Sequence, residues 1–475
     1  MIAMAMLQRV QPPRMSVVGR MIMVVRSQTQ CLCVVRGAGS VSEDGRQPRL
    51  GKRKVALFVG YDGTHYRGLQ MQPSQLHLSS QEGHSKTIEE VLESAIFTSG
   101  GILESNRGNL GKIGWSRSSR TDKRVHSLST VISMKLECNP DIFESEPDGG
   151  SIAESINEYL PPEVRVFAVQ RVVKSFDARR ECMRRYYEYY VPVSFLSLMI
   201  EKEMGAKKLD DVLQTLGDAW RSYQGHHAFH NFTKRRLYRP EREPGAEGVI
   251  LQKEPPTRSD AVHSKGMIHF AWKAERGESD PIVRSHYRFV EECECSPEPM
   301  ELVHQGGEPC VKLSVCGASF MLHQIRHMVG GAVLVALGKM PQELLQAALA
   351  PPVRMNLPLA PPGTLVLRGA DFGTFRKSYD GKPSATERSS GSSLVLLPGG
   401  WKRQQEFERS VLYQGLHRQL QHEDWQRWSE SLSLVTYDAE VADSIVQQSI
   451  EWFDRREEMK LVRRRLREES SLDIA

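Results

Sequence analysis

Short apolar and β-branched runs dominate the middle of the chain, with a smaller number of amphipathic stretches between them. The runs predict strands at 55–61, 128–136, 164–173, 185–191, 267–273, 311–315 and 365–372. Helical spacing of apolar positions predicts helices at 85–97, 151–160 and 210–223, and a further helix that ends near Lys339. Because strands outnumber helices and do not alternate strictly with them, the pattern favours an α+β fold with mainly antiparallel strands.

The same pattern divides the chain into segments. Two stretches of similar strand and helix content, 55–175 and 176–372, are predicted to form two related sheet-plus-helix halves of one core. Around them we expect a polar linker (43–54), charged insertions near 239–265 and 275–309, a low-complexity linker (373–402) and a helical C-terminal extension (403–475).

Positive charge is concentrated at the N-terminus. The 475 residues carry 63 Lys and Arg against 58 Asp and Glu, while residues 1–42 hold five arginines and no acidic residue. The net charge of +5 is therefore that of this segment, and a surface that binds a polyanion must arise from local clustering of cations. An acid-free, arginine-bearing segment fits an organellar transit peptide. We therefore expect a mitochondrial protein; the alternative is a disordered tail on a nuclear or cytoplasmic one.

Two classes of protein are disfavoured by the composition. The longest apolar run, 328–337, is too short to span a bilayer, so no membrane segment is expected. The eight cysteines include no C-x-x-C pair, and the histidines at 226 and 230 have no acidic residues beside them. We therefore expect reduced thiols and no metal site.

One segment surrounds a single acidic residue with cations and hydroxyls. SRSSRTDKRVH (116–126) holds Asp122 among four basic residues, just before a predicted strand. The cations would favour the ionised carboxylate, and an ionised, fixed aspartate can act as a nucleophile or a base. The structural alternative is an aspartate that closes a turn beside Ser and Thr.

Two further segments carry unexpected charge. Arg326 lies on the apolar face of a predicted helix, where it must meet a carboxylate or phosphate, or else extend its head group to water. FDARRECMRRYYEYY (176–190) interleaves arginines with tyrosines. Cations hold phosphates and aromatic rings stack on unpaired bases, so this segment suits looped or single-stranded RNA, although one tyrosine face can equally belong to the core.

Six motifs follow one another along the chain: YDGTHYRGLQ (61–70), SRTDKRVH (119–126), FDAR (176–179), RYYEY (185–189), GHHAFHNFT (225–233) and SFMLHQIRHMVG (319–330). In order and spacing, they resemble the TruA-type tRNA pseudouridine synthases, and their eukaryotic branch in particular. The resemblance covers about residues 55–372. The resemblance implies a pseudouridine synthase core with a cleft between its two halves. It also implies that a uridine in tRNA is isomerised, so that the sugar is joined to C5 of the base, without any cofactor.

The resemblance implies roles for individual residues. Asp122 falls on the family's invariant aspartate and would attack the ribose or remove a sugar proton after the base is flipped out of its stack. Tyr187 would stack on the flipped base, and Arg326 would pair with Asp122. The residues expected to bind RNA or to line the site are Arg120, Lys123, His126, Arg179, Arg185 and Leu322.

Arg124 departs from the family pattern, which usually has glycine at this position. A glycine would suit a positive φ or a close approach of RNA, whereas an arginine could tolerate the position, contact RNA or accompany weakened catalysis. An RNA-binding or RNA-assembly factor on the same fold is therefore the alternative to an isomerase. A hydrolase that uses Asp122 would lack a second carboxylate. The expected partner is tRNA, with other structured RNA as a further candidate, and the sequence leaves monomer and dimer both open.

Overall fold

The computed structural model describes residues 51–71, 86–205, 207–233, 267–273, 282–303, 306–372 and 394–472. The predicted transit peptide (1–42) and the predicted insertion near 239–265 lie outside the described residues. Parts of the two predicted linkers and of the insertion at 275–309 lie outside them as well.

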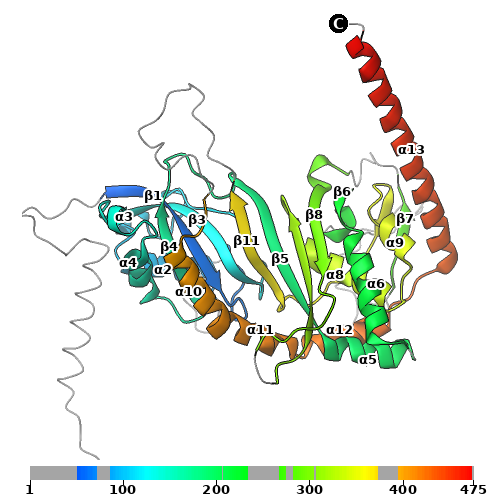
Figure 1. Cartoon of the computed structure of the whole chain (residues 1–475), viewed down its shortest axis with the longest axis horizontal. Coiled ribbons are helices and arrows are strands. Elements are labelled where there is room, and N and C mark those ends of the chain that lie inside the picture. Colours follow the sequence, from blue (N-terminus) through cyan, green and yellow to red (C-terminus); the bar gives the residue numbers. More distant parts are fainter. Residues whose placement is uncertain are drawn as a thin grey trace, which may run out of the picture.

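Nine strands form a single sheet that runs through both halves of the molecule (Figure 1). Its path is β4-β1-β3-β11-β5-β9-β8-β6, with β2 paired to β3, and among the described strands only β3 and β11 pair in parallel. The strands are β1 (Gly51–Tyr61), β2 (Ser116–Arg117), β3 (His126–Cys138), β4 (Val164–Arg171), β5 (Cys182–Pro192), β6 (Gly225–Ala228), β8 (Tyr287–Cys295), β9 (Cys310–Gly317) and β11 (Leu365–Phe372). A separate pair consists of β7 (Phe270–Trp272) and β10 (Val353–Met355). The predicted α+β class with mainly antiparallel strands is confirmed.

Strand β11 joins the two halves. On one side Val366 is paired with His126 of β3, and on the other Leu367 is paired with Tyr187 of β5. The start of β3 and the middle of β5 are therefore held one strand apart, although they come from different halves of the sequence. At the other end of the first half, β1 begins at Gly51 and not at 55, because residues 51–54 pair with β3.

Helices pack against the strands in each half and form its core. In the first half Leu92 and Ile152 pack with β1, β3 and β4; in the second, Trp220 and Val333 belong to a larger core that includes β5, β8 and β9. The first-half helices are α2 (Ile88–Thr98), α3 (Ile142–Ser145) and α4 (Gly150–Asn157). The second-half helices are α5 (Val193–Glu203), α6 (Leu209–Arg221), α8 (Gln324–Ala336) and α9 (Gln342–Ala347).

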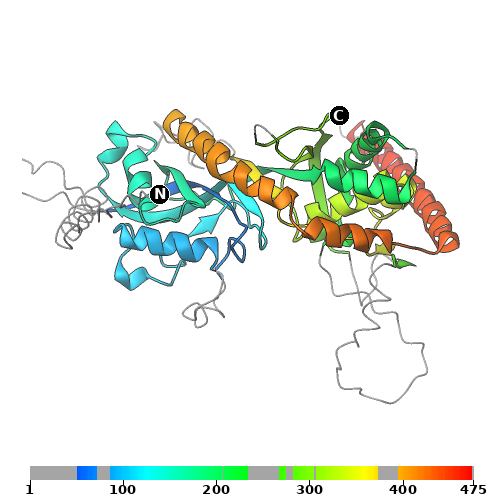
Figure 2. The same cartoon turned by 90° about the horizontal axis from the view of Figure 1, so that it is seen from below.

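The C-terminal helices belong to the body of the molecule. Helix α10 (Pro398–Phe407), a π-helical turn (Glu408–Leu412) and α11 (Tyr413–Leu420) form one rod that crosses from the first half toward the second (Figure 2). Alternate residues of β1 divide between two cores: Leu57 packs with α2 and α4, and Phe58 packs in the cluster that contains Phe407 and Leu416 of the rod. Helix α12 (Asp424–Ser433) then enters the second-half core through Trp425 and Trp428.

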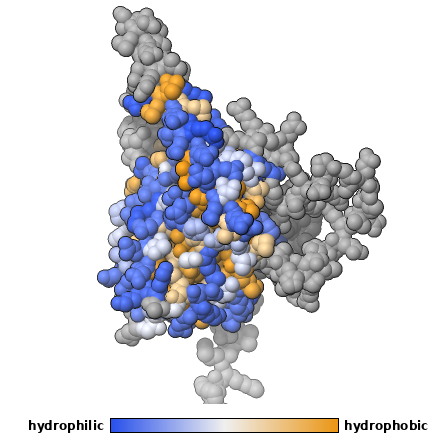
Figure 3. Space-filling view, turned by 90° about the vertical axis from the view of Figure 1, so that its right-hand side faces the viewer, coloured by the Kyte–Doolittle hydropathy of each residue, from blue (hydrophilic) through white to orange (hydrophobic). Residues whose placement is uncertain are grey.

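The last helix, α13 (Ala439–Leu472), projects away from the second half (Figure 1). Ala442 and Ile445 anchor its first turns in the core, whereas Met459, Leu461 and Val462 are exposed further along. The end of the molecule that carries α13 presents a mainly hydrophilic surface with small, scattered apolar areas (Figure 3). Within the described residues, no helix combines the length and apolar character needed to cross a bilayer.

Candidate active site

Asp122 faces a cavity of about 680 Å³ at the junction of the two halves. The first half contributes the loop that follows β2, with Asp122, and the second contributes Tyr187 from β5 and the segment before α8. The side chain of Asp122 is 29% exposed, and its Oδ2 lies 3.6 Å from Nε2 of His323. The carboxylate is therefore accessible to a substrate, and one of its oxygens lies beside a histidine.

The backbone of the YDGTHYRG segment positions the Asp122 loop. The amide of Leu69 donates to the carbonyl of Thr121 at 3.2 Å, and the amide of Arg124 donates to the carbonyl of Tyr66 at 3.3 Å. Gly68 has a φ of +106°, and a Cβ there would lie 2.8 Å from the Thr121 oxygen, so this close approach requires glycine. The YDGTHYRG segment thus fixes the backbone on either side of Asp122.

Tyr187 lines the same cavity and contacts this loop. Its hydroxyl is 2.6 Å from Oγ of Ser119, and its ring meets Phe320 edge to face with the centroids 5.3 Å apart. Burial raises the pKa of Tyr187 to about 12, so the phenol keeps its proton at neutral pH. It can donate a hydrogen bond and offer a ring to a base, and it is a poor general base in this state.

Arg326 is on α8, behind the cavity lining. Its Nε donates to the carbonyl of Ala360 at 2.7 Å. Burial lowers the pKa of Arg326, and the negative charges of Asp122 and Asp424 act in the opposite direction. The predicted pairing with Asp122 is thus an electrostatic influence: no ion pair joins the two side chains in the described part of the chain.

Cations surround the carboxylate. The predicted RNA-binding residues Arg120, Lys123 and Arg179 line the cavity and are exposed, and Leu322, which is 51% exposed, lines it as well. Arg185 also lines it, but its guanidinium donates to the carbonyls of Ser118 and Ala318 and so ties the two loops together. The other basic residues of the lining are Arg67, Arg117 and Arg288. With Asp122 as the one carboxylate among the described lining residues, the cavity attracts a polyanion.

His126 does not line the cavity, contrary to the prediction. It is completely buried, with Nδ1 3.1 Å from Oδ1 of Asp62 and Nε2 2.8 Å from the carbonyl of Gly363. The histidine joins the start of β3 to two other segments beneath the loop. The motif alone could not show that His126 is buried while Asp122 is exposed. Both residues occur in the same short stretch, and the turn between them decides which side chain faces outward.

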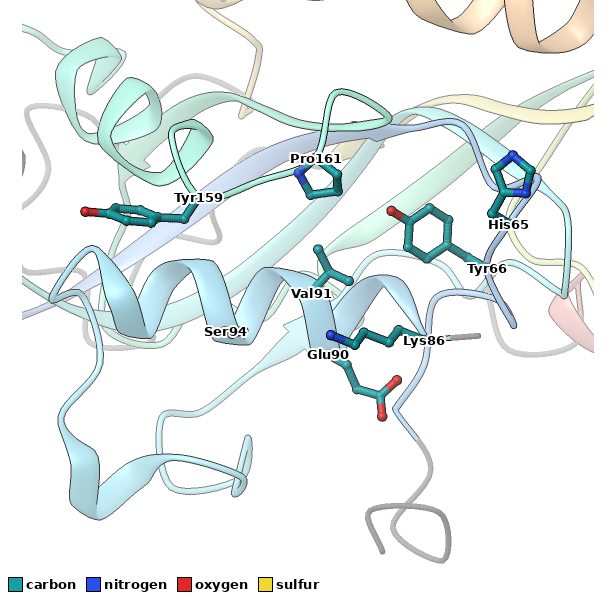
Figure 4. Close-up of a pocket in the computed structure, with 8 residues that line it drawn as sticks. All are labelled: His65, Tyr66, Lys86, Glu90, Val91, Ser94, Tyr159 and Pro161. Carbon is teal, nitrogen blue, oxygen red and sulfur yellow. The ribbon is translucent and has the colours of Figure 1, made fainter. Parts of the chain in front are cut away.

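A second cavity of about 500 Å³ lies beside α2 and contains no candidate for the same chemistry (Figure 4). Tyr66, Tyr159 and Pro161 border it above the helix, with Lys86 and Glu90 at its edge. The Glu90 carboxylate accepts hydrogen bonds from the amide and hydroxyl of Thr87, at 2.6 and 2.9 Å, and so caps α2. Its carboxylate is therefore already committed to the helix terminus.

The cysteines and histidines of the described residues form no cluster of metal ligands. The six cysteines within the described residues are free thiols, and Cys31 and Cys33 lie outside those residues. His226 stacks on Tyr287, and His230 is buried, with Nε2 2.6 Å from the carbonyl of Val353.

Comparisons with known proteins show the family of the chain. The profile of the family described as tRNA pseudouridine synthase matches residues 260–373. A tRNA pseudouridine synthase 1 of Yarrowia lipolytica is 30% identical over 391 residues, which is 72% of this chain and 67% of the relative. The chain belongs to the tRNA pseudouridine synthase family. The resemblance predicted from the motifs is confirmed.

Other family members extend the comparison to fungi and mammals. The tRNA pseudouridine synthase 1 of Eremothecium gossypii is 30% identical over 72% of this chain and 66% of its own length. The pseudouridylate synthase 1 homologue of Mus musculus is 29% identical over 71% of this chain and 66% of its own length. Several relatives are covered less fully, down to 60% of the Candida albicans protein, so the chain spans a little under two thirds of their length.

Three residues in or near the candidate site were not predicted as functional. Ser119 holds the Tyr187 hydroxyl, His323 lies beside Asp122, and Asp424 acts on Arg326. Ser119 and His323 stand within the motifs at 119–126 and 319–330, so motif membership could have indicated them. Asp424 gave no local signal, since it comes from a helix far along the chain.

Proposed function

We propose that this protein is a tRNA pseudouridine synthase that isomerises uridine to pseudouridine with Asp122 as the catalytic group. The observation that carries the proposal is the position of Asp122. It is partly exposed in a cation-lined cavity and shares that cavity with the buried ring of Tyr187. An active site for a base within RNA needs these parts: a reactive carboxylate, a ring on which the base can stack and cations for the flanking phosphates.

Each residue has a defined task in this reaction. The target uridine leaves its stack and enters the cavity, because a stacked base hides its glycosidic bond. Asp122 either attacks C1′ or removes a sugar proton as the N1–C1′ bond breaks. The base then turns and C5 bonds to C1′. In the first route the Asp122–C1′ bond breaks as the new bond forms, and in the second the proton returns to the sugar. C5 then loses its proton while N1 gains one. Tyr187 supports the base during this turn, and Arg326 supplies positive charge behind Asp122.

The substrate and the location extend this proposal. The relatives are named for tRNA, so an unmodified tRNA is the first substrate to test. The composition of residues 1–42 supports a mitochondrial location, which a fluorescent fusion with and without that segment would test. Loss of organelle signal without residues 1–42 is expected; an unchanged distribution would contradict this location.

The test is pseudouridine formation on an unmodified tRNA transcript, mapped by chemical labelling of pseudouridine. Asp122→Asn keeps the shape of the side chain and removes its charge and nucleophile. We expect wild type to modify defined uridines, and the variant to lose at least about 10³-fold in rate, in line with removal of a nucleophile, while its affinity for RNA stays similar. Asp141→Asn is the matched control, since Asp141 is exposed outside the cavity. If both proteins bind RNA and neither modifies any transcript, an RNA-binding or assembly role replaces the isomerase.

A further inference from the structure

Arg124 has an unusual backbone conformation. Its φ is +65°, in the left-handed region, where a residue with a side chain is disfavoured. Within the described residues, His323, with a φ of +63°, is the one other non-glycine residue in this region. Both lie beside Asp122: Arg124 is two positions later, and His323 contacts the carboxylate. Backbone strain of about 1 kcal/mol or more persists only where the surroundings hold it in place.

The side chain of Arg124 shows what holds it. One terminal nitrogen lies 2.6 Å from Oδ2 of Asp424, and the other donates to Oε1 of Gln419 at 2.8 Å. These acceptors come from the first turn of α12 and from α11. A charged guanidinium that makes two hydrogen bonds with fixed partners forms a strong, oriented contact. In its own loop, the amide of Arg124 is also bonded to the carbonyl of Tyr66.

The partners of Arg124 are themselves firmly placed. Gln419 is 5% exposed, and its side chain packs so closely on Gly363 that a Cβ at this glycine would clash with it. The residue after Asp424 is Trp425, whose ring packs against Phe195 with centroids 5.1 Å apart. Asp424 stands at the N-terminus of α12, where the helix dipole favours a carboxylate. The C-terminal helices thus offer a rigid anchor and not a mobile surface group.

We propose that Arg124 is a positioning residue that fastens the Asp122 loop to helices α11 and α12. This inference rests on the proposed function for its catalytic meaning. Both terminal nitrogens of Arg124 are engaged by the protein, and the residue is absent from the cavity lining, so it does not serve as a phosphate contact. The C-terminal helices thereby set the direction in which Asp122 faces Tyr187. A carboxylate displaced by about 1 Å can lose roughly 10²-fold in rate.

The experiment measures kcat and KM on a tRNA transcript for Arg124→Ala, Asp424→Asn and the double variant, below their unfolding temperatures. We expect each single variant to lower kcat by about 10- to 100-fold, with KM changed less than about twofold. The double variant should be no worse than Arg124→Ala, because that change already removes the contact with Asp424 that Asp424→Asn weakens. Arg124→Gly removes the same contact but relieves the backbone strain, and it should recover part of the lost kcat.

Arg120→Ala is the matched control, because Arg120 is an exposed cation of the cavity in the same loop. It should raise KM and leave kcat nearly unchanged. If Arg124→Ala behaves like Arg120→Ala, while Asp424→Asn keeps wild-type kcat and KM, Arg124 contacts RNA and the positioning role is overturned. Wild-type kcat in Arg124→Ala, Arg124→Gly and Asp424→Asn together also overturns it.

Hydrogen exchange separates this inference from the proposed function. The amides of residues 118–126 should exchange at least about fivefold faster in Asp424→Asn than in wild type, since local opening depends on the contacts that hold the loop. If exchange is faster in Asp424→Asn but wild type modifies no RNA, the contact between Arg124 and the C-terminal helices is supported and the isomerase function is rejected. Unchanged exchange in a protein whose wild type is active would reject the fastening alone.

Discussion

Tyr187 contributes to the site through its ring and one hydrogen bond. Tyr187→Phe keeps the ring and its contact with Phe320 but removes the bond to Ser119, which is worth about 0.5–1.5 kcal/mol. We expect a loss of roughly 2- to 10-fold in kcat, and the same loss in Ser119→Ala without further loss in the double variant. Tyr187→Ala should instead unfold far more easily, because truncating a buried aromatic residue costs about 3–5 kcal/mol.

The pH dependence follows from the same residue. Since the pKa of Tyr187 is raised to about 12, wild type and Tyr187→Phe should have parallel rate profiles between about pH 6 and pH 9. The raised value stabilises the folded state below the unfolded pKa of about 10, and this contribution is lost as the pH rises through about 12. A rising limb near neutral pH that disappears in Tyr187→Phe would show that the phenol loses its proton during catalysis.

At the residue scale, the sequence indicated chemistry better than orientation. Asp122, Tyr187 and the cations were predicted from residue types together with the family resemblance, and the structure brings them to one cavity. The sequence could not separate His126 from these residues, because the burial of His126 depends on Asp62 and Gly363, which lie in other segments. The partner of Arg124 was equally hidden: Asp424 is 300 positions away, and nothing local marks it.

At the element scale, α8 rests directly on the proline-rich segment that follows β10. Nδ1 of His327 lies 3.0 Å from the carbonyl oxygen of Leu357, and Arg326 donates to the carbonyl of Ala360. Gly330 of the same helix packs on Pro358, which lies between Leu357 and Ala360, and a Cβ on Gly330 would clash with the Pro358 carbonyl. The helix itself was predictable from its apolar spacing, but its packing on this segment was not, because the sequence shows only that 350–363 breaks regular structure.

Gly330→Ala tests the close packing of α8 on the Pro358 backbone. In an exposed helix the change would stabilise by up to about 1 kcal/mol, but here the added methyl group must displace backbone, so we expect a loss of about 1–3 kcal/mol. Activity should fall as well, since the displaced segment holds Arg326. Gly369→Ala in β11 is the control, because a Cβ there meets nothing within 4 Å. Thermal unfolding of both variants decides it, and equal midpoints would contradict the close packing.

At the scale of the whole molecule, the sheet and the C-terminal rod make one body from two halves. Local pattern predicted the helices of the tail, but it gave no sign that Phe407 would pack on Phe167 of β4, with ring centroids 5.5 Å apart. The place of β11 between β3 and β5 was hidden for the same reason, since pairing over long sequence distance leaves no periodic trace. These long-range contacts are what bring Asp122 and Tyr187 to one cavity.

The positive charge expected to bind RNA is concentrated at the cavity, and the salt dependence of RNA binding tests this. If Arg120, Lys123 and Arg179 each neutralise one phosphate of a looped RNA, the logarithm of the binding constant should fall with the logarithm of salt concentration with a slope near −2, from about −0.7 per contact. Arg120→Ala and Lys123→Ala should each reduce the magnitude of the slope by about 0.7. Lys112→Ala removes an exposed cation outside the cavity and should leave the slope unchanged. Equal effects of Lys112→Ala and Arg120→Ala in filter-binding titrations would mean that RNA is held by diffuse charge, and that the cavity does not define the path of the RNA backbone.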